Sequence, residues 1–304
     1  MSQPRHKRLF DSSILLKKIV KSQGPLRTEI TSRQLKGVPT LFANTYRALV
    51  RIVGFFKYNL NTGVFLRGQS HCHRSMLPSA YRGSAISDGD LDQFLTDYRA
   101  EIGVDAKPAQ AYSTEPLLQH YGIRTRWLDV VDSIPHAIYF SINVSSITPW
   151  PKPGKSLLTF LPSLEEYGFI YLIDCGKLEP IILPNGEVVP GAWRGDKGTE
   201  VCDLRIARAS NALRPHAQHG LLIRQARNKD IWNQIIARIA IPVESARSWL
   251  GSGEAFSRTA FFPPTVWDNV YGSLLGWKVT NLLTRYKTSG IDLGHINEYD
   301  FLVY

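Results

Sequence analysis

Two short apolar runs constrain the fold of this chain most strongly. Residues 168–174 (Gly-Phe-Ile-Tyr-Leu-Ile-Asp) and 220–224 (Gly-Leu-Leu-Ile-Arg) are too short for stable helices and too uniformly apolar for surface strands. We therefore predict strands buried on both faces. Elsewhere the sequence predicts helices at 12–22, 44–58, 88–101, 116–120, 135–142, 230–240 and from 266. It also predicts a strand at 64–67 and a loop at 23–42. Because helices and strands do not alternate regularly, the sequence predicts an α+β fold with N-terminal helices.

The positive charge is concentrated at the N-terminus. Residues 1–60 hold twelve Lys and Arg against two acidic residues, an excess of ten that equals the net charge of the whole chain. We therefore expect a neutral globular body preceded by a basic helical region. Basic regions commonly bind nucleic acid or an acidic protein. A solvated face that only aids solubility is the alternative, and the sequence does not separate the two.

Several familiar sites are absent from the sequence. It contains no Gly-x-Gly-x-x-Gly, Gly-x-x-x-x-Gly-Lys-Ser/Thr, Gly-x-Ser-x-Gly or His-Glu-x-x-His. The three cysteines, Cys72, Cys175 and Cys202, fit neither a disulfide framework nor zinc spacing. Within His71-Cys72-His73 only the two histidines can point the same way on an extended segment, so we expect no metal site.

Hydropathy indicates a protein without a membrane segment. No run of about 18 apolar residues occurs, and no apolar secretory segment follows Met1. We therefore expect a cytoplasmic protein with no membrane contact.

Two segments are dense in residues suited to binding. In the first, Arg67 ends an apolar strand, which presents its planar fork to a phosphate or carboxylate, and Gly68 lets a ligand approach the backbone. A structural arginine paired to a nearby acid is the alternative. The second runs from Gln119 to Phe140. Within it His120 and Asp129 are either an acid–base pair or a structural hydrogen-bonded pair.

Four motifs follow one another in the chain: Phe-x-Arg-Gly-Gln at 65–69, Leu-Pro-Ser at 77–79, Gln-His-Tyr-Gly-x-x-Thr-Arg-x-Leu-Asp at 119–129 and Ala-x-Tyr-Phe at 137–140. In this order and spacing they resemble the motifs of the FRG domain family. One departure is Arg124, where the family usually has proline. The later segments Tyr-Leu-Ile-Asp at 171–174, Ala-Gln-x-Gly-x-x-Ile at 217–223 and Phe-Pro at 262–263 fit as well, so the resemblance covers about residues 61–270. We predict a basic helical region at 1–60, an FRG domain at 61–275 and a C-terminal extension at 276–304.

The FRG pattern is in turn similar to that of the ADP-ribosyltransferases. This similarity implies a split mixed β-sheet core and NAD as the cofactor. It implies that Arg67 binds an NAD phosphate, that the Gly68 backbone meets the nicotinamide carboxamide, and that Tyr121 stacks on nicotinamide. The implied catalytic residues are Arg67, Thr125 and Gln218. The implied cofactor-binding residues are Arg67, Gly68, Gln69, Tyr121, Arg126, Tyr139 and Phe140.

One position departs from the transferase pattern. Gln218 stands where these enzymes carry a glutamate that binds the ribose and stabilises a cationic transition state. A neutral amide can bind the ribose but gives less electrostatic stabilisation. Glu200 and Glu298 are the alternative carboxylates.

The resemblance thus predicts a toxin-like, NAD-dependent mono-ADP-ribosyltransferase. The basic N-terminal region favours nucleic acid, RNA or DNA, as the acceptor over protein. An acidic antitoxin or regulatory protein bound to the same region is an alternative partner, as in a toxin–antitoxin or phage-defence system. Two other functions remain open. One is a non-catalytic module that binds a nucleotide or nucleic acid through Arg67, Gln69 and Arg126. The other is a hydrolase that uses His120 and Asp129.

Overall fold

The computed structural model describes residues 30–35, 38–73, 75–83, 86–102, 108–149, 156–208, 212–225, 229–251, 253–296 and 298–299. Within these ranges helices and strands are mixed without regular alternation, which confirms the predicted α+β class. The predicted helix at 12–22 lies outside the described residues. None of the described helices is long and apolar enough to cross a membrane.

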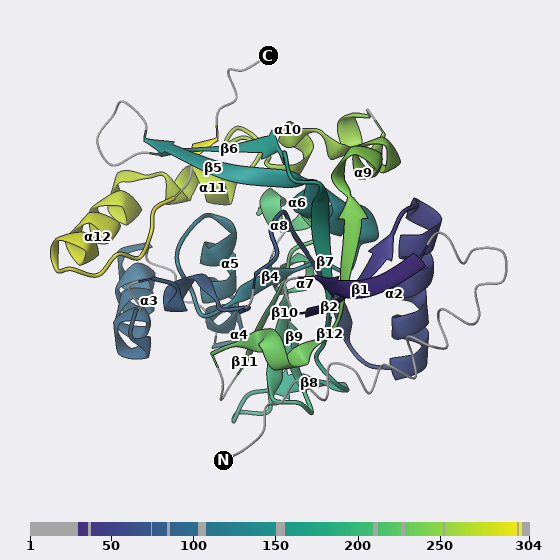
Figure 1. Cartoon of the computed structure of the whole chain (residues 1–304). Helices are drawn as coiled ribbons and strands as arrows, with labels where there is room; N and C mark the ends of the chain where they lie inside the picture. The colour runs from purple at the N-terminus through teal and green to yellow at the C-terminus, as the bar shows by residue number, and fades with distance from the viewer. Residues whose placement is uncertain are drawn as a thin grey trace.

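Two five-stranded sheets form the centre of the described molecule (Figure 1). The first has the order β1 (Ile30–Leu35), β2 (Val38–Ala43), β12 (Ile235–Pro242), β7 (Tyr167–Asp174) and β3 (Val64–Gln69). The second has the order β4 (Leu128–Val130), β11 (Leu221–Gln225), β10 (Thr199–Asp203), β9 (Val188–Gly195) and β8 (Leu178–Ile182). The edge strands β3 and β4 meet through two 2.8 Å backbone hydrogen bonds between Leu66 and Val131.

The strongest sequence predictions fall on these sheets. The run 168–174 forms β7, which is buried along almost its whole length and pairs with β12 and β3 on its two sides. The run 220–224 corresponds to β11, which pairs with β10 and β4. Both strands therefore lie inside their sheets, as their uniform apolarity predicted.

The prediction of a helix at 230–240 is wrong. A short 3₁₀ turn, η4 (Ile231–Gln234), is followed by β12, which is buried on both faces between β2 and β7. Isoleucines spaced four residues apart fit a helix face, but a strand buried on both faces gives the same pattern. The β-branched side chains favour the strand.

The prediction of a loop over 23–42 is also wrong for its described part. Residues 30–43 form a β1–β2 hairpin, and β2 pairs in parallel with β12. The buried Arg238 on β12 donates from Nε to Thr40 Oγ1 at 2.9 Å. This part of the basic region is therefore built into the first sheet.

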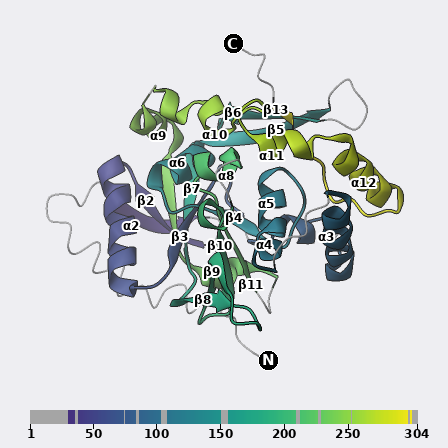
Figure 2. The same ribbon diagram turned by 180° about the vertical axis from the view of Figure 1, so that it is seen from behind.

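Helices flank the sheets on both sides (Figures 1 and 2). The predicted helix 44–58 is α2 (Tyr46–Leu60), which Thr45 caps by accepting from Ala48 N. Its buried side carries Leu49, Ile52, Val53 and Phe56, whereas Tyr46 and Val50 are each 39% exposed. The remaining helices and turns are η3 (Ser79–Tyr81), α3 (Asp88–Ile102), α4 (Pro108–Tyr112), α5 (Thr114–His120), α6 (Ile134–Ile142), α7 (Leu204–Ala207), α8 (Leu213–Ala217), α9 (Val243–Leu250), η5 (Glu254–Phe256), α10 (Arg258–Phe261), α11 (Asn269–Leu274) and α12 (Trp277–Thr288).

Most of these helices confirm the predicted segments. The amphipathic segment 88–101 is α3, with its apolar residues buried, and the segments 116–120 and 135–142 are α5 and α6. The helix predicted from 266 begins only at Asn269, because Asp268 is the capping residue and accepts from Tyr271 N. A third sheet, β13 (Glu298–Tyr299), β6 (Ser156–Pro162) and β5 (Asn143–Pro149), lies across the top in Figure 1.

Two glycines allow α6 to pack directly on the first sheet. A Cβ on Gly68 would lie 2.0 Å from the carbonyl oxygen of Ala137, and a Cβ on Gly168 would lie 2.4 Å from that of Ser141. Both distances are too short for a real contact, so β3 and β7 need glycine where the helix crosses them. The side of Gly68 that lacks a side chain thus faces α6. Glycine is therefore required at this position for helix packing, and its predicted role in ligand approach stays a prediction.

Candidate functional site

A cavity of about 510 Å³ lies where the two sheets meet, a volume within the usual range for small-molecule sites. Its walls come from the end of β3, the C-terminus of α5, β4, the α6–β5 junction, β6 and the turn between α8 and β11. Of the residues predicted for the site, Arg67, Gly68, Gln69, Phe140 and Gln218 line it. His120 and Asp129, the alternative acid–base pair, also line it.

Arg67 is a cation without a matching anion. Its Nη1 donates to the backbone carbonyl of Asp129, but its Nε is buried and has no hydrogen-bond partner among the described residues. Burial lowers the pKa of Arg67 to about 10 although Asp129 raises it, so the guanidinium stays charged at neutral pH. No carboxylate of a described residue forms an ion pair with it. A partly buried charge without an ion pair is costly, and an anionic ligand in the cavity would offset that cost.

Gln69 adds a second unsatisfied group to the same strand end. Its Oε1 is buried and has no hydrogen-bond partner among the described residues. Buried polar side-chain atoms are normally paired. Arg67 and Gln69 therefore offer one donor and one acceptor that a ligand in the cavity can satisfy.

His120 presents an acceptor nitrogen to the cavity. Gln218 donates from Nε2 to the carbonyl oxygen of Phe261 at 2.9 Å, so its Oε1, 3.1 Å from His120 Nδ1, acts as the acceptor. The ring proton of neutral His120 therefore sits on Nδ1, and Nε2 carries the lone pair. That Nε2 is buried and has no hydrogen-bond partner among the described residues.

Asp129 lies across from this nitrogen. Its Oδ1 is 3.8 Å from His120 Nε2, and its side chain is 40% exposed. Its Oδ2 accepts from Gln119 Nε2 at 3.1 Å. Gln119 is fixed in turn because its Oε1 accepts from Thr125 Oγ1 at 2.6 Å and from Ser79 Oγ at 3.1 Å. Thr125 itself is buried and does not line the cavity, so it acts on the site through Gln119.

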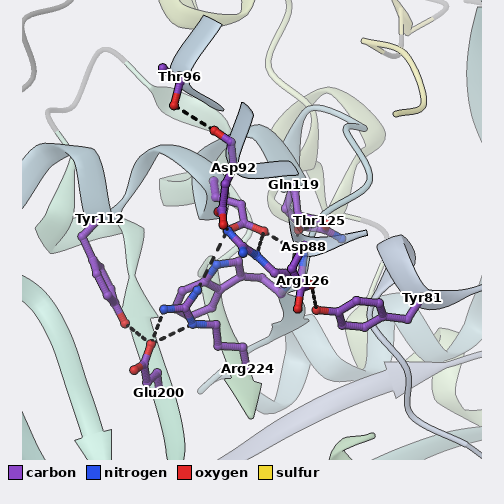
Figure 3. Close-up of polar contacts among 12 residues, drawn as sticks. Tyr81, Asp88, Asp92, Thr96, Tyr112, Gln119, Thr125, Arg126, Glu200 and Arg224 are labelled. Carbon is purple, nitrogen blue, oxygen red and sulfur yellow. Dashed lines mark hydrogen bonds and ion pairs between the residues drawn. The ribbon is translucent and has the colours of Figure 1, made fainter. Parts of the chain in front are cut away.

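Arg126 does not line the cavity and lies in an ionic network (Figure 3). It binds both carboxylate oxygens of Glu115, at 3.1 and 2.8 Å, and reaches Asp92 at 2.8 Å. Burial alone would lower its pKa, but the hydrogen bonds and charge of Glu115 raise it. Arg126 is therefore a structural cation that holds the segment before β4 against α3 and α5.

Of the two alternative carboxylates, Glu200 does not reach the cavity wall. Glu200 is bound by Arg224 at 2.6 Å, by Arg194 at 3.0 Å and by the hydroxyl of Tyr112 at 2.9 Å (Figure 3). It does not line the cavity. Glu298 is in β13, and its side chain is outside the described part.

Tyr121 lies in the hydrophobic core. It is fully buried, donates to Asp268 Oδ2 at 2.8 Å and stacks on Tyr271 with ring centres 5.7 Å apart. Arg214 lies 4.4 Å over its ring. The ring is therefore not available to nicotinamide. Tyr139 is likewise occupied, because it stacks on Phe261 at 3.9 Å.

Replacing Tyr121 with phenylalanine tests this correction. The variant leaves the buried Asp268 with one hydrogen-bond donor fewer, and we expect a loss of about 1–3 kcal/mol in the free energy of unfolding. The NAD binding that the resemblance predicts should be unaffected, with an affinity within about twofold of that of the wild type. Urea denaturation and isothermal titration calorimetry measure the two quantities. A variant of normal stability that no longer bound NAD would restore the stacking role.

Two aromatic residues of the cavity escaped the sequence prediction. Phe160 on β6 and Phe262 after α10 both line it, and their rings stack with centres 4.3 Å apart. With Phe140 they form an aromatic wall. Phe160 lies in none of the motifs, and the motif that contains Phe262 is more than 100 residues from Phe140, so only the folded chain brings the three rings to one site.

The cysteines take no part in the cavity. Burial raises the pKa of Cys175 and of Cys202 to about 12, so these thiols stay protonated at neutral pH. His71 and His73 do line the cavity, with ring centres 6.4 Å apart. In the described ranges no three His, Cys, Asp or Glu side chains are placed together to hold a metal ion.

The fold and site define an α+β protein with a cationic, partly aromatic ligand cavity between two sheets. Residues 62–147 match the family model of the FRG domain. The matched segment contains β3, α5, β4 and α6, which supply Arg67, His120, Asp129 and Phe140. No curated protein and no solved structure matches the chain.

Proposed function

We propose that this protein is an NAD-dependent ADP-ribosyltransferase and that the cavity binds NAD. The observation that carries the proposal is the charged, unpaired guanidinium of Arg67 in the cavity wall. The diphosphate of NAD is an anion whose oxygens suit the planar fork of an arginine. The similarity of the FRG motifs to those of ADP-ribosyltransferases supports the same assignment.

The remaining walls fit the other parts of NAD. Phe140, Phe160 and Phe262 offer apolar faces for a heteroaromatic ring. Gln69 Oε1 is an acceptor with no partner, which suits an amide or hydroxyl donor of the ligand. Two sheets that meet beside Arg67 are consistent with the split core of the transferase fold, which we propose as the finer fold class.

The acceptor is proposed from the charge distribution. The basic excess of residues 1–60 favours nucleic acid, RNA in particular. The protein would then be a toxin-like cytoplasmic enzyme, and an acidic antitoxin bound to the same region would keep it inactive. A variant lacking residues 1–29, upstream of the β1–β2 hairpin, is expected to bind RNA more weakly and with a smaller salt dependence. Unchanged RNA affinity would remove the argument for nucleic acid.

A doubly labelled NAD tests the activity itself. The protein is incubated with NAD labelled in nicotinamide and in the adenylate phosphate, together with RNA, DNA or a protein extract. We expect release of free nicotinamide and transfer of the phosphate label to the nucleic acid. Failure to bind NAD would contradict the proposal.

A binding module is the second candidate. The specific observation in its favour is Gln218, which replaces the usual glutamate and has both ends of its amide already hydrogen-bonded. NAD binding without nicotinamide release, in the presence of each acceptor, would establish the module in place of the enzyme.

A further inference from the structure

Two hydrogen-bond acceptors face each other in the cavity with no donor of their own between them. His120 Nε2 carries a lone pair, and Asp129 Oδ1 lies 3.8 Å away. Both residues line the cavity. A ligand group that carries a hydrogen, such as a hydroxyl, can donate to one of these atoms while the other stays close to it.

Two glutamines hold this pair in position from opposite sides. Gln218 accepts from His120 Nδ1–H, while the Phe261 carbonyl fixes the direction of its amide. Gln119 donates to Asp129 Oδ2, while the hydroxyls of Thr125 and Ser79 fix its amide. Each reactive side chain thus has one atom tied to a glutamine and one atom left facing the cavity. Such support is what a preorganised catalytic group requires.

We propose that His120 and Asp129 are the catalytic pair of the transferase reaction and that the acceptor group is a hydroxyl. This inference rests on the proposed function. His120 Nε2 acts as the general base, and the Asp129 carboxylate stabilises the positive charge that develops on the ribose. Asp129 thereby supplies the carboxylate that Gln218 cannot.

The step balances as follows. The bond between ribose C1′ and the nicotinamide ring nitrogen breaks, and its electron pair passes to the ring, which leaves as neutral nicotinamide. The acceptor oxygen forms a new bond to C1′. The proton of the acceptor hydroxyl passes to His120 Nε2, which later releases it to solvent.

Burial favours the basic form of His120 at neutral pH. It lowers the pKa most strongly, and Arg214 on α8 lowers it further, while Asp129 on β4 and the hydrogen bond that His120 donates to Gln218 raise it. The pKa therefore lies below the ordinary value of about 6.5. The base is ready at neutral pH, and activity should fall only as the pH drops through this lowered pKa.

The same geometry gives Gln218 a positioning role. Its neutral amide fixes the ring proton on Nδ1 without adding charge. A glutamate at this position would stabilise the imidazolium form and raise the pKa of His120. Glutamine at 218 therefore suits an enzyme whose base is a histidine.

The tautomer of His120 is the first test, because it requires no NAD. Nitrogen-15 NMR of the labelled full chain distinguishes a ring proton on Nδ1 from one on Nε2, and the signal that disappears in His120→Asn assigns the residue. We expect the proton on Nδ1. In Gln218→Leu, which removes the acceptor, we expect a mixture of the two tautomers. A ring proton on Nε2 in the wild type overturns the inference.

Kinetics provide the second test. His120→Asn is expected to slow nicotinamide release about 10²–10⁴-fold, the usual contribution of a general base. Asp129→Asn is expected to slow it about 10²–10³-fold, the usual loss when one electrostatic stabilising group is removed. Gln218→Leu should move the acidic limb of the pH–rate profile to lower pH, since it removes a hydrogen bond that raises the pKa of His120. Tyr121→Phe, next to His120 but in the core, is the matched control and should retain the wild-type rate and profile.

Reactions with and without RNA distinguish two possible sources of the acceptor hydroxyl, water and RNA. Water as acceptor gives nicotinamide and free ADP-ribose, whereas RNA as acceptor gives label on the RNA, and both should require His120. Nicotinamide release could be lost in Arg67→Met but unchanged in His120→Asn. That result would overturn the inference and leave the proposed function standing. A wild-type protein that does not bind NAD would overturn the proposed function and the inference with it.

Discussion

Replacing Arg67 with methionine is expected to reduce kcat/KM for nicotinamide release about 10²–10⁴-fold. Two charge-assisted hydrogen bonds to a phosphate are worth about 1.5–3 kcal/mol each, and about 1.4 kcal/mol corresponds to a tenfold change in rate. Arg67 has no ion pair among the described residues, so little stability depends on its charge. We expect the free energy of unfolding to change by no more than about 1 kcal/mol, the value of its bond to the Asp129 carbonyl.

Arg67→Lys is the matched variant for this prediction. It keeps the charge but lacks the planar fork, so a loss between those of wild type and Arg67→Met is expected. Nicotinamide release measured over a range of NAD concentrations, with urea denaturation of both variants, provides the comparison. Wild-type release by a folded Arg67→Met protein would show that the cavity does not bind NAD through this residue.

The fold was predictable where local pattern alone decides structure. The apolar face of α3 is visible at helical spacing, and β7 is visible as a short run that is apolar throughout. β12 was misassigned because a strand buried on both faces has no alternation to distinguish it from a helix. Its identity depends on β2 and β7 lying on its two sides, which the local sequence does not encode.

The sequence predicted which segments supply the site residues, but not which of their side chains point into the cavity. His120 and Tyr121 are neighbours at the end of α5, where successive side chains point about 100° apart. One must therefore face the core if the other faces the cavity, and only tertiary packing against Tyr271 and Asp268 decides which. For the same reason the sequence favoured Gln218 as the catalytic group, while the structure places its amide behind His120.

The ionic network around Arg126 provides the second large effect. Glu115 is only 5% exposed and accepts three hydrogen bonds from the Arg126 side chain and one from its backbone N–H. Removing one partner of a buried ion pair costs about 3–5 kcal/mol when the other charge loses its buried partner, and without Glu115 the side chain of Arg126 would keep only its contact with the exposed Asp92. Glu115→Ala is therefore expected to lower the free energy of unfolding by about that amount.

Asp92→Ala is the matched control, since it removes the other acid that binds Arg126. Asp92 is 65% exposed, and an exposed ion pair contributes about 1 kcal/mol or less. Urea denaturation of the two variants should therefore show a large loss for Glu115→Ala and a small one for Asp92→Ala. NAD affinity measured below the unfolding transition distinguishes the two roles of Arg126. A structural cation predicts near-normal affinity in both variants. If Arg126 instead bound the ligand, freeing it from Glu115 would change the NAD affinity of Glu115→Ala. That result would place Arg126 in the cofactor site again.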